Sequence, residues 1–180
     1  MKKKGWLFAL LTALIAGPLA AQAQGAACAV EAGFSPEGSA SALVLRTIES
    51  AHQSIRLAAY LFTSPSIARA LIAAKRRGVD VRVVVDQDGA RGPASKAALN
   101  LLANAKIPAR TVSAWPLHHD KYMVIDSATV QTGSFNYTAA AARQNSENTL
   151  VVRACPDLAS QYLAHWQSRW GQGVQWRVGY

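Results

Sequence analysis

Acidic residues are scarce in this sequence: 10 Asp and Glu stand against 19 Lys and Arg, and the 180 residues carry a formal net charge of +9. With 51% hydrophobic residues, the chain is long enough for one globular domain with a substantial core, and two domains are disfavoured. The basic balance favours polyanionic partners, because cationic side chains that neutralise phosphates release counterions. A soluble basic surface is the simpler alternative.

The sequence also lacks the common signatures of metal and nucleotide sites. It contains no Walker glycine loop, no zinc-ligand spacing and no calcium loop, and His118 with Asp120 is too sparse a pair to hold a metal. These absences predict chemistry without a metal or a cofactor. The sequence has no internal repeat either, so each motif occurs once per chain.

Long apolar runs are missing after the first 23 residues. Three lysines at positions 2–4 precede an apolar run over 6–19, and Ala21-Gln22-Ala23 fits a small-residue cleavage site. This pattern predicts a secretory signal peptide over residues 1–23, since the run is short for the alternative, a retained membrane anchor. We expect an exported domain, periplasmic or secreted, over residues 24–180, without stable membrane insertion. Removal of the three lysines lowers the charge from +9 to +6.

Cysteine is nearly absent as well. Cys28 and Cys155 are the two cysteines of the chain, and they lie near opposite ends of the expected mature domain. In an exported protein such a pair can close a long-range disulfide. We expect the bridge, and two unpaired thiols are the alternative.

Hydrophobic periodicity predicts alternating strands and helices. The predicted strands cover 29–34, 55–62, 79–85, 107–112, 121–125, 129–132 and 149–152, and the predicted helices cover 39–51, 65–77, 95–104 and 156–170. The helix over 65–77 joins two buried strands as a βαβ crossover, which places those strands in parallel. The fold class is therefore α/β: a single-domain α/β/α sandwich with a mixed, largely parallel central sheet flanked by helices.

Several histidines and tryptophans lie on predicted helices without partners at catalytic spacing. His52 and His165 are each isolated, so we interpret both as packing or surface residues outside any site. Trp166 and Trp170 are spaced i and i+4, which indicates a core face rather than a platform for stacking bases.

The most informative stretch is 118–148, where two short strands are separated by a turn at Asp126. On a strand, residues i and i+2 share a face, so His119 and Lys121 project together, whereas Asp120 and Tyr122 point the other way. A lone His-x-Lys pair is more often a solvated strand edge. The second strand, however, leads into a further run of polar residues with the same spacing.

That second run presents a hydroxyl at Ser134 and a carboxamide at Asn136 on one side, after Gly133, which allows close approach of the backbone to a ligand. With the His119 imidazole and the Lys121 ammonium, these groups suit the three non-bridging oxygens of a phosphoryl group. Histidine can attack phosphorus directly if a carboxylate fixes its tautomer, and Glu147 is the candidate. The residues therefore favour phosphoryl transfer.

These residues carry a resemblance to a known family. The pattern His119-x-Lys121-x4-Asp126, followed by Gly133-Ser134-x-Asn136, resembles the HKD motif of the phospholipase D superfamily, and Glu147 falls where that family places its histidine partner. Over most of the mature chain the sequence resembles the small EDTA-resistant periplasmic endonucleases with a single HKD motif. The resemblance implies a phospholipase D-like fold, catalysis by His119 and Lys121, and phosphoryl binding by Lys121, Ser134 and Asn136. We expect Asp126 to order the turn or the neighbouring backbone rather than to act as a base, and Gly133 to lie next to the residues that contact the substrate.

A single motif supplies one histidine where the superfamily's reaction uses two. A homodimer with two-fold symmetry would place both copies of His119 in one composite site, as single-motif members of the family do. One copy would attack phosphorus and the other would protonate the leaving oxygen.

The resemblance leaves three functions open. The leading hypothesis is an exported, metal-independent endonuclease that hydrolyses DNA, with RNA as a further substrate, without sequence preference. A phospholipase D that hydrolyses phosphatidyl head groups is the alternative, because the motif does not identify the leaving group. A non-catalytic polyanion-binding protein is the third hypothesis, and the complete polar set argues against it.

Overall fold

The computed structural model describes residues 27–178. The expected signal peptide over residues 1–23 lies outside the described residues. In the described part of the chain, no helix combines the length and the apolar character needed to cross a membrane.

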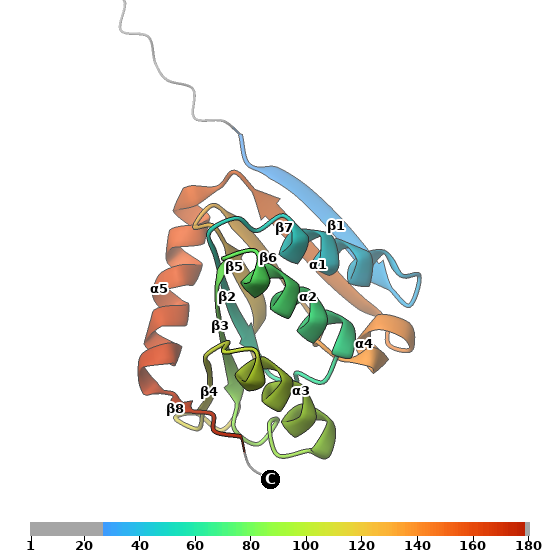
Figure 1. Cartoon of the computed structure of the whole chain (residues 1–180). Coiled ribbons are helices and arrows are strands. Elements are labelled where there is room, and N and C mark those ends of the chain that lie inside the picture. Colours follow the sequence, from blue (N-terminus) through green and yellow to red (C-terminus); the bar gives the residue numbers. More distant parts are fainter. Residues whose placement is uncertain (1–26, 179–180) are drawn as a thin grey trace, which may run out of the picture.

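One mixed sheet of eight strands forms the centre of the described domain, in the order β1-β7-β6-β5-β2-β3-β4-β8 (Figure 1). The strands are β1 (Ala29–Ser35), β2 (Ser54–Ala59), β3 (Asp80–Asp86), β4 (Ala109–Val112), β5 (Lys121–Ile125), β6 (Thr129–Gly133), β7 (Glu147–Arg153) and β8 (Val174–Gln175). The α/β fold with a mixed sheet flanked by helices is confirmed.

The parallel part of the sheet is smaller than the sequence suggested. β2 pairs in parallel with β3, and β3 with β4, whereas all other neighbouring strands pair antiparallel. The physical reason is the length of the connections. Helical crossovers join β2, β3 and β4, but a tight turn joins β5 to β6, and a tight turn can only reverse the chain into an antiparallel neighbour.

Helices cover both faces of the sheet. They are α1 (Ser39–Glu49), α2 (Pro65–Arg76), α3 (Pro93–Asn104), α4 (Ala139–Arg143) and α5 (Pro156–Gln172). Figure 1 shows α1, α2 and α3 on one face and α5 on the other. The sequence did not predict α4 or β8, which are too short to produce a periodic pattern.

Local sequence explains the ends of α2. The Ser64 hydroxyl accepts a hydrogen bond from the Ile67 N–H, and Pro65 occupies the first helical position, where its missing N–H costs nothing. The chain leaves the helix at Gly78, whose φ of 96° is one that glycine adopts without strain. The helix therefore begins at the end of β2 and returns the chain to the start of β3.

Two apolar cores result. The larger core packs α1, α2 and α3 on the sheet through fully buried residues such as Val44, Leu57 and Leu71. The smaller core packs α5 against the opposite face, where the Trp166 indole N–H donates to the Leu57 carbonyl at 2.9 Å. Trp166 is 2% exposed, so its expected place in a core is confirmed.

The two cysteines meet at the end of the sheet where β1 begins and β7 ends. Cys28 and Cys155 form a disulfide with a Cα–Cα distance of 5.0 Å across 127 residues of sequence. The Cys155 N–H also donates to the Ala128 carbonyl in the β5–β6 turn at 2.8 Å. This end of the sheet is therefore tied together by covalent and hydrogen-bonded links.

Candidate active site

The sequence-predicted polar residues gather at the other end of the sheet. Lys121 begins β5, Gly133 ends β6 and Glu147 begins β7. Because β5, β6 and β7 pair antiparallel, these three strand ends lie at one edge, where the neighbouring residues His119, Ser134 and Asn136 are also located. The structure thus brings the predicted site into one region, with the exception of Asp126.

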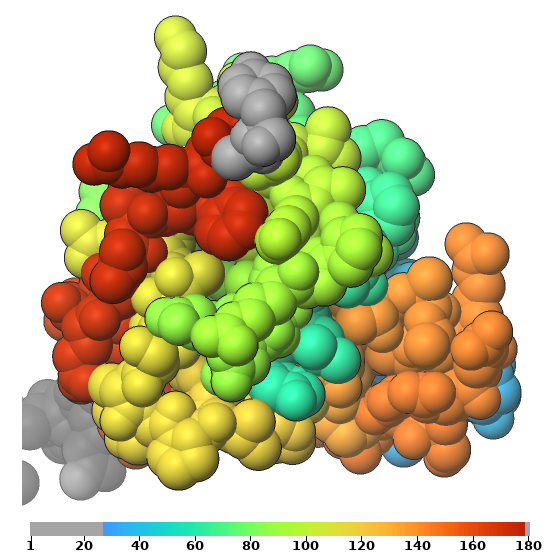
Figure 2. Space-filling model, turned by 90° about the horizontal axis from the view of Figure 1, so that it is seen from below, coloured from blue at the N-terminus to red at the C-terminus, as the bar shows by residue number. Residues whose placement is uncertain are grey.

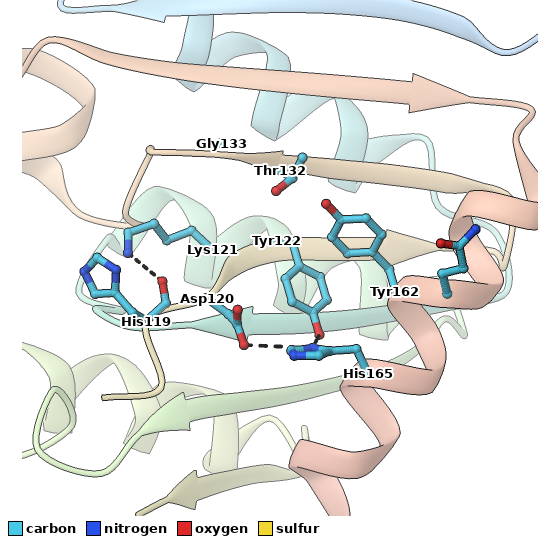
Figure 3. Close-up of a pocket in the computed structure, with 9 residues that line it drawn as sticks. His119, Asp120, Lys121, Tyr122, Thr132, Gly133, Tyr162 and His165 are labelled. Atoms are coloured by element: carbon cyan, nitrogen blue, oxygen red, sulfur yellow. Dashed lines mark hydrogen bonds and ion pairs between the residues drawn. The ribbon is translucent and has the colours of Figure 1, made fainter. Parts of the chain in front are cut away.

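His119 and Lys121 lie together at the start of β5 (Figure 3). The Lys121 ammonium donates to the His119 carbonyl at 2.8 Å. Tyr60, directly after β2, contacts both: its ring centroid lies 4.7 Å from that of His119 and 5.2 Å from Lys121 Nζ. The His119 imidazole is exposed, whereas Lys121 is only 8% exposed. An accessible nucleophile therefore stands beside a largely buried cation.

The Lys121 ammonium is held in an unfavourable environment. Burial lowers the pKa of Lys121, and the negative charges of Asp120 and Glu147 only partly raise it again. In residues 27–178 no carboxylate oxygen lies within ion-pair distance of Lys121 Nζ. Because a buried cation without a counter-charge attracts an anionic ligand strongly, this position suits a phosphoryl oxygen.

Glu147 and Ser134 interact directly. The Ser134 hydroxyl donates to Glu147 Oε2 at 2.6 Å, and the Asn145 amide donates to Glu147 Oε1 at 2.9 Å. The same hydroxyl accepts from the Asn148 N–H at 3.0 Å. Both Glu147 oxygens are therefore engaged by neighbours on its own side of the site. The expected role of Glu147 in orienting His119 stays a prediction. For that role, one Glu147 oxygen must leave Ser134 or Asn145 and accept a hydrogen bond from His119.

Asn136 and Gly133 complete this side of the site. The Asn136 side-chain oxygen is buried and has no hydrogen-bond partner among the described residues, which leaves the carboxamide available to a ligand. A Cβ at Gly133 would lie 2.3 Å from the Asn148 carbonyl oxygen, so the neighbouring β7 backbone requires glycine here. The expected close approach of a ligand to Gly133 stays a prediction.

Asp126 lies outside the site, at the opposite end of β5, roughly 17 Å from Lys121 at about 3.4 Å per residue. Its carboxylate accepts the backbone N–H groups of His52, Gln53 and Ser54 at 2.9, 2.8 and 2.7 Å. Burial alone would raise the pKa of Asp126, but the three hydrogen bonds outweigh it and lower the pKa. Asp126 thus orders neighbouring backbone at the turn.

A groove of about 410 Å³ runs from His119 and Lys121, which we call the catalytic pair for the role predicted from the motif, along α5; we call it the α5 groove. His165 lies in this groove, so its interpretation as a residue outside the site is wrong. The His165 ring nitrogen Nδ1 lies 2.8 Å from the Tyr122 hydroxyl and 3.9 Å from Asp120 Oδ2 (Figure 3). Burial raises the pKa of Tyr122, so its hydroxyl stays protonated and can donate to His165.

His118 lies behind the catalytic pair. Its Nδ1 is 3.2 Å from Asp120 Oδ2, its backbone N–H donates to the buried Asp86 carboxylate, and its Nε2 is buried without a partner among the described residues. Burial lowers the pKa of His118, although Asp120 and Asp86 act to raise it. Within residues 27–178 no group of three or more His, Cys, Asp or Glu side chains is arranged to hold a metal ion.

Sequence reasoning missed the contributions of distant segments. Tyr60 lies near the end of the strand predicted over 55–62, and its place at the carboxyl end of a central strand was the available signal. Tyr162 and His165 line the α5 groove from α5. Their spacing of three residues indicates a shared helix face, but only the packing of α5 against β5 and β6 shows what that face contacts.

Comparisons with known proteins agree with this geometry. Residues 44–170 match the family described as cardiolipin synthase, PLD-like domain. A phospholipase D of Rickettsia bellii is 37% identical over 136 residues, which cover 76% of this chain and 66% of the relative. A mitochondrial cardiolipin hydrolase of Xenopus laevis is 38% identical over 102 residues, which cover 57% of this chain and 48% of the relative.

A solved structure is also similar over nearly its whole length. The crystal structure of Nuc, a phospholipase D family member from Salmonella typhimurium, superposes with a TM-score of 0.83 at 54% identity, covering 84% of this chain and 99% of that chain. The chain belongs to the phospholipase D superfamily, a class of enzymes that act on phosphodiester bonds. The resemblance inferred from the motif is confirmed.

Proposed function

We propose that this protein is an exported, metal-independent phosphodiesterase that cleaves DNA internally, with RNA as a second substrate of the same chemistry. The observation that carries the proposal is the buried Lys121 ammonium, which has no carboxylate partner within residues 27–178 and lies beside the accessible His119 imidazole. In such a pair the ammonium binds a phosphoryl oxygen and the imidazole attacks phosphorus, so a second cation is not needed to hold the phosphodiester. The basic sequence and the similarity to Nuc favour a polyanionic substrate.

The proposed reaction has two steps. In the first step, an imidazole nitrogen of His119 attacks phosphorus, the bond from phosphorus to the leaving sugar oxygen breaks, and that oxygen takes a proton from a second histidine. In the second step, this histidine removes a proton from water as the water oxygen attacks phosphorus, and the bond from phosphorus to His119 breaks. Lys121, Ser134 and Asn136 hold the phosphoryl oxygens, and Glu147 orients His119.

The second histidine comes from another copy of the chain. The described residues place one exposed histidine beside Lys121 at the sheet edge, and His118 is buried behind it. We therefore propose a homodimer in which His119 of the partner subunit acts as the acid.

A nuclease assay in EDTA tests the substrate. Purified chain 24–180 should convert supercoiled plasmid to nicked and linear forms with EDTA present, and it should leave phosphatidylcholine vesicles intact. The alternative, a phospholipase D that acts on phosphatidyl head groups, has support from the names of the Rickettsia and Xenopus relatives. Release of choline without plasmid cleavage would establish it, and binding of DNA without any turnover would indicate the polyanion-binding protein.

Mixing experiments test the shared site. In a dimer of one His119→Ala chain and one wild-type chain, the composite site contains a single histidine, so we expect almost no activity. At equal expression, about a quarter of randomly paired dimers are wholly wild type, and total activity should fall to that fraction. Activity that follows the number of wild-type chains would contradict the dimer.

Export is tested separately. The protein recovered from the periplasm or medium should begin at Gln24, as N-terminal sequencing would show. A chain that stays in the cytoplasm with residues 1–23 attached would contradict the signal peptide.

A further inference from the structure

A second cavity, of about 140 Å³, lies between α2 and α4 on the side of the sheet opposite the α5 groove; we call it the α2–α4 cavity. The polar residues that line it are Ser41, Ser64, Ser66, Arg69 and Arg143, and no acidic residue lines it. Its volume equals that of roughly five liquid waters at about 30 Å³ each, which accommodates one phosphate group. The cavity therefore offers hydroxyl and guanidinium donors to a small anion.

The two arginines of this cavity lack counter-charges. Arg56 and Arg82 share the Asp80 carboxylate, and Arg91 pairs with Asp88, so each of these guanidinium groups has a carboxylate within ion-pair distance. In residues 27–178, neither the Arg69 nor the Arg143 side chain, both of them exposed, has an ion-pair or hydrogen-bond partner. Two cations that border one cavity repel each other, and an anion between them removes that repulsion.

The walls of the cavity continue directly from the catalytic segments. Thr63 and Ser64, which follow β2 and Tyr60, donate their backbone N–H groups to the Tyr137 carbonyl at 2.9 Å each. Tyr137 follows Asn136, and the three residues from Asn136 to Ala139 span at most about 11 Å. Figure 2 shows the teal segment after β2 and the orange segment around α4 on the face that also carries the yellow residues before β5.

We propose that the α2–α4 cavity binds a phosphate of the substrate strand a few nucleotides away from the phosphodiester that is cleaved. This inference rests on the proposed nuclease function. Arg69 and Arg143 contact the phosphate oxygens, since guanidinium groups form paired hydrogen bonds with such oxygens. A contact of this kind positions the strand across the edge of the sheet and carries no base-sequence information. A minimal substrate has a single phosphate, which occupies the cleavage site, so it gains no binding free energy from the α2–α4 cavity.

The test compares a substrate that reaches the cavity with one that does not. A double variant, Arg69→Gln with Arg143→Gln, is assayed on a single-stranded oligonucleotide of 20 residues and on bis(4-nitrophenyl) phosphate. We expect the ratio of kcat/KM on the oligonucleotide to kcat/KM on the small diester to fall about tenfold at low salt. The slope of log KM against log salt for the oligonucleotide should become shallower by about 0.7 for each phosphate contact that is lost.

The same helix offers a matched control. Lys75 and Arg76 lie at the far end of α2, about 10 Å from Arg69 along the helix axis, and neither lines the cavity. A Lys75→Gln and Arg76→Gln variant removes the same charge and should change the ratio by less than about twofold. A third variant, Arg69→Lys with Arg143→Lys, keeps the charge but loses the paired hydrogen bonds, so its ratio should lie between those of the wild type and the glutamine variant, which separates loss of binding from loss of folding.

Each outcome decides the inference. A ratio that stays at the wild-type value, or that falls equally in the control variant, would overturn it. Loss of activity confined to cardiolipin vesicles, with the oligonucleotide unaffected, would assign the cavity to a lipid phosphate and overturn it as well. If the wild-type enzyme hydrolyses the small diester but no oligonucleotide, the proposed nuclease function fails, and the inference fails with it.

Discussion

At one end of the β5–β6 hairpin, the Asp126 carboxylate accepts three backbone hydrogen bonds, and the neighbouring Cys155 N–H is bonded to the turn. At the other end, the Lys121 ammonium is buried without a carboxylate partner, and the Asn136 side-chain oxygen is buried with no partner in the described chain. We call the first the turn end of the sheet and the second the catalytic end. The hairpin therefore carries a carboxylate with three hydrogen bonds at one end and, at the other, an ammonium without a carboxylate partner in the described chain.

The pKa shifts follow the same division. Hydrogen bonds lower the pKa of Asp126, so the folded state stabilises its charged form. Burial lowers the pKa of Lys121, so the folded state disfavours its charged form. When folding stabilises the charged form of a group, that charge adds to the free energy of unfolding. When folding penalises the charged form, a ligand of opposite charge relieves the penalty, and the relief adds to the free energy of ligand binding. The comparison predicts that variants at the two ends will have opposite consequences.

The largest effect is expected at His119, which supplies the nucleophile. His119→Ala should abolish turnover of DNA, while its exposed side chain makes the loss of folding stability small. Hydrolysis is measured on plasmid in EDTA and stability by thermal unfolding. His52, an exposed histidine near the turn end, provides the control, because His52→Ala should retain wild-type rates. Wild-type turnover by folded His119→Ala protein would refute the mechanism.

The next largest effect is expected for the disulfide at the turn end. Replacing Cys28 and Cys155 by serine releases a loop of 127 residues, and chain entropy predicts a loss of about 5 kcal/mol of unfolding free energy. Urea denaturation measures the loss. The rate of DNA cleavage by the folded variant should stay within about twofold of wild type, since the bridge lies far from the catalytic end. Two alkylatable thiols in the native, non-reduced protein would show that the bridge does not form.

Lys121→Met tests the penalised charge at the catalytic end. Activity should fall by a factor that corresponds to about 3 kcal/mol or more, because a fixed cation in a protected site stabilises developing charge. Stability should stay unchanged or rise, since an apolar side chain of similar length avoids the cost of burying an ammonium. Rates of plasmid cleavage and urea denaturation measure the two effects. Lower stability together with normal activity would show that the Lys121 charge stabilises the fold and does not serve catalysis.

Sequence patterns were sufficient for most of the fold and for part of the site. Periodicity predicted the strands and the long helices, because each buries one face whose spacing is visible in the chain. The motif predicted His119, Lys121, Ser134 and Asn136 at one place. The direction in which neighbouring strands pair was harder to predict. The sequence shows the crossover helices clearly and therefore suggested a largely parallel sheet. It does not show that β7 returns between β1 and β6.

The rest of the site depends on contacts between distant segments. Tyr60 directly follows β2 and His165 lies on α5, and neither has a catalytic neighbour in sequence that would have indicated its place. The hydrogen bond between Ser134 and Glu147 joins residues on either side of α4. Packing of whole elements decides such contacts, and a single sequence carries no direct record of it.

The smallest effect is expected for Asp126→Asn at the turn end. Asparagine tolerates the positive φ of 51° at this position, so the change removes the charge and one acceptor oxygen without backbone strain. Hydrogen bonds to charged groups are each worth about 1.5–3 kcal/mol, and one acceptor remains. We therefore expect a loss of about 2 kcal/mol in urea denaturation at neutral pH, with DNA cleavage by the folded protein unchanged.

The pH dependence of this loss identifies its cause. Because folding lowers the pKa of Asp126 below its ordinary value of 3.8, its stabilising contribution is complete well above pH 3.8 and is lost as the pH falls through the lower, folded-state value. The difference between wild type and Asp126→Asn should therefore shrink in acid below about pH 4. Glu49, an exposed carboxylate at the end of α1, is the control, and Glu49→Gln should change stability by less than about 0.5 kcal/mol. A difference for Asp126→Asn that stays constant from pH 7 to pH 3 would show that the lost stability comes from the turn conformation and not from the carboxylate charge.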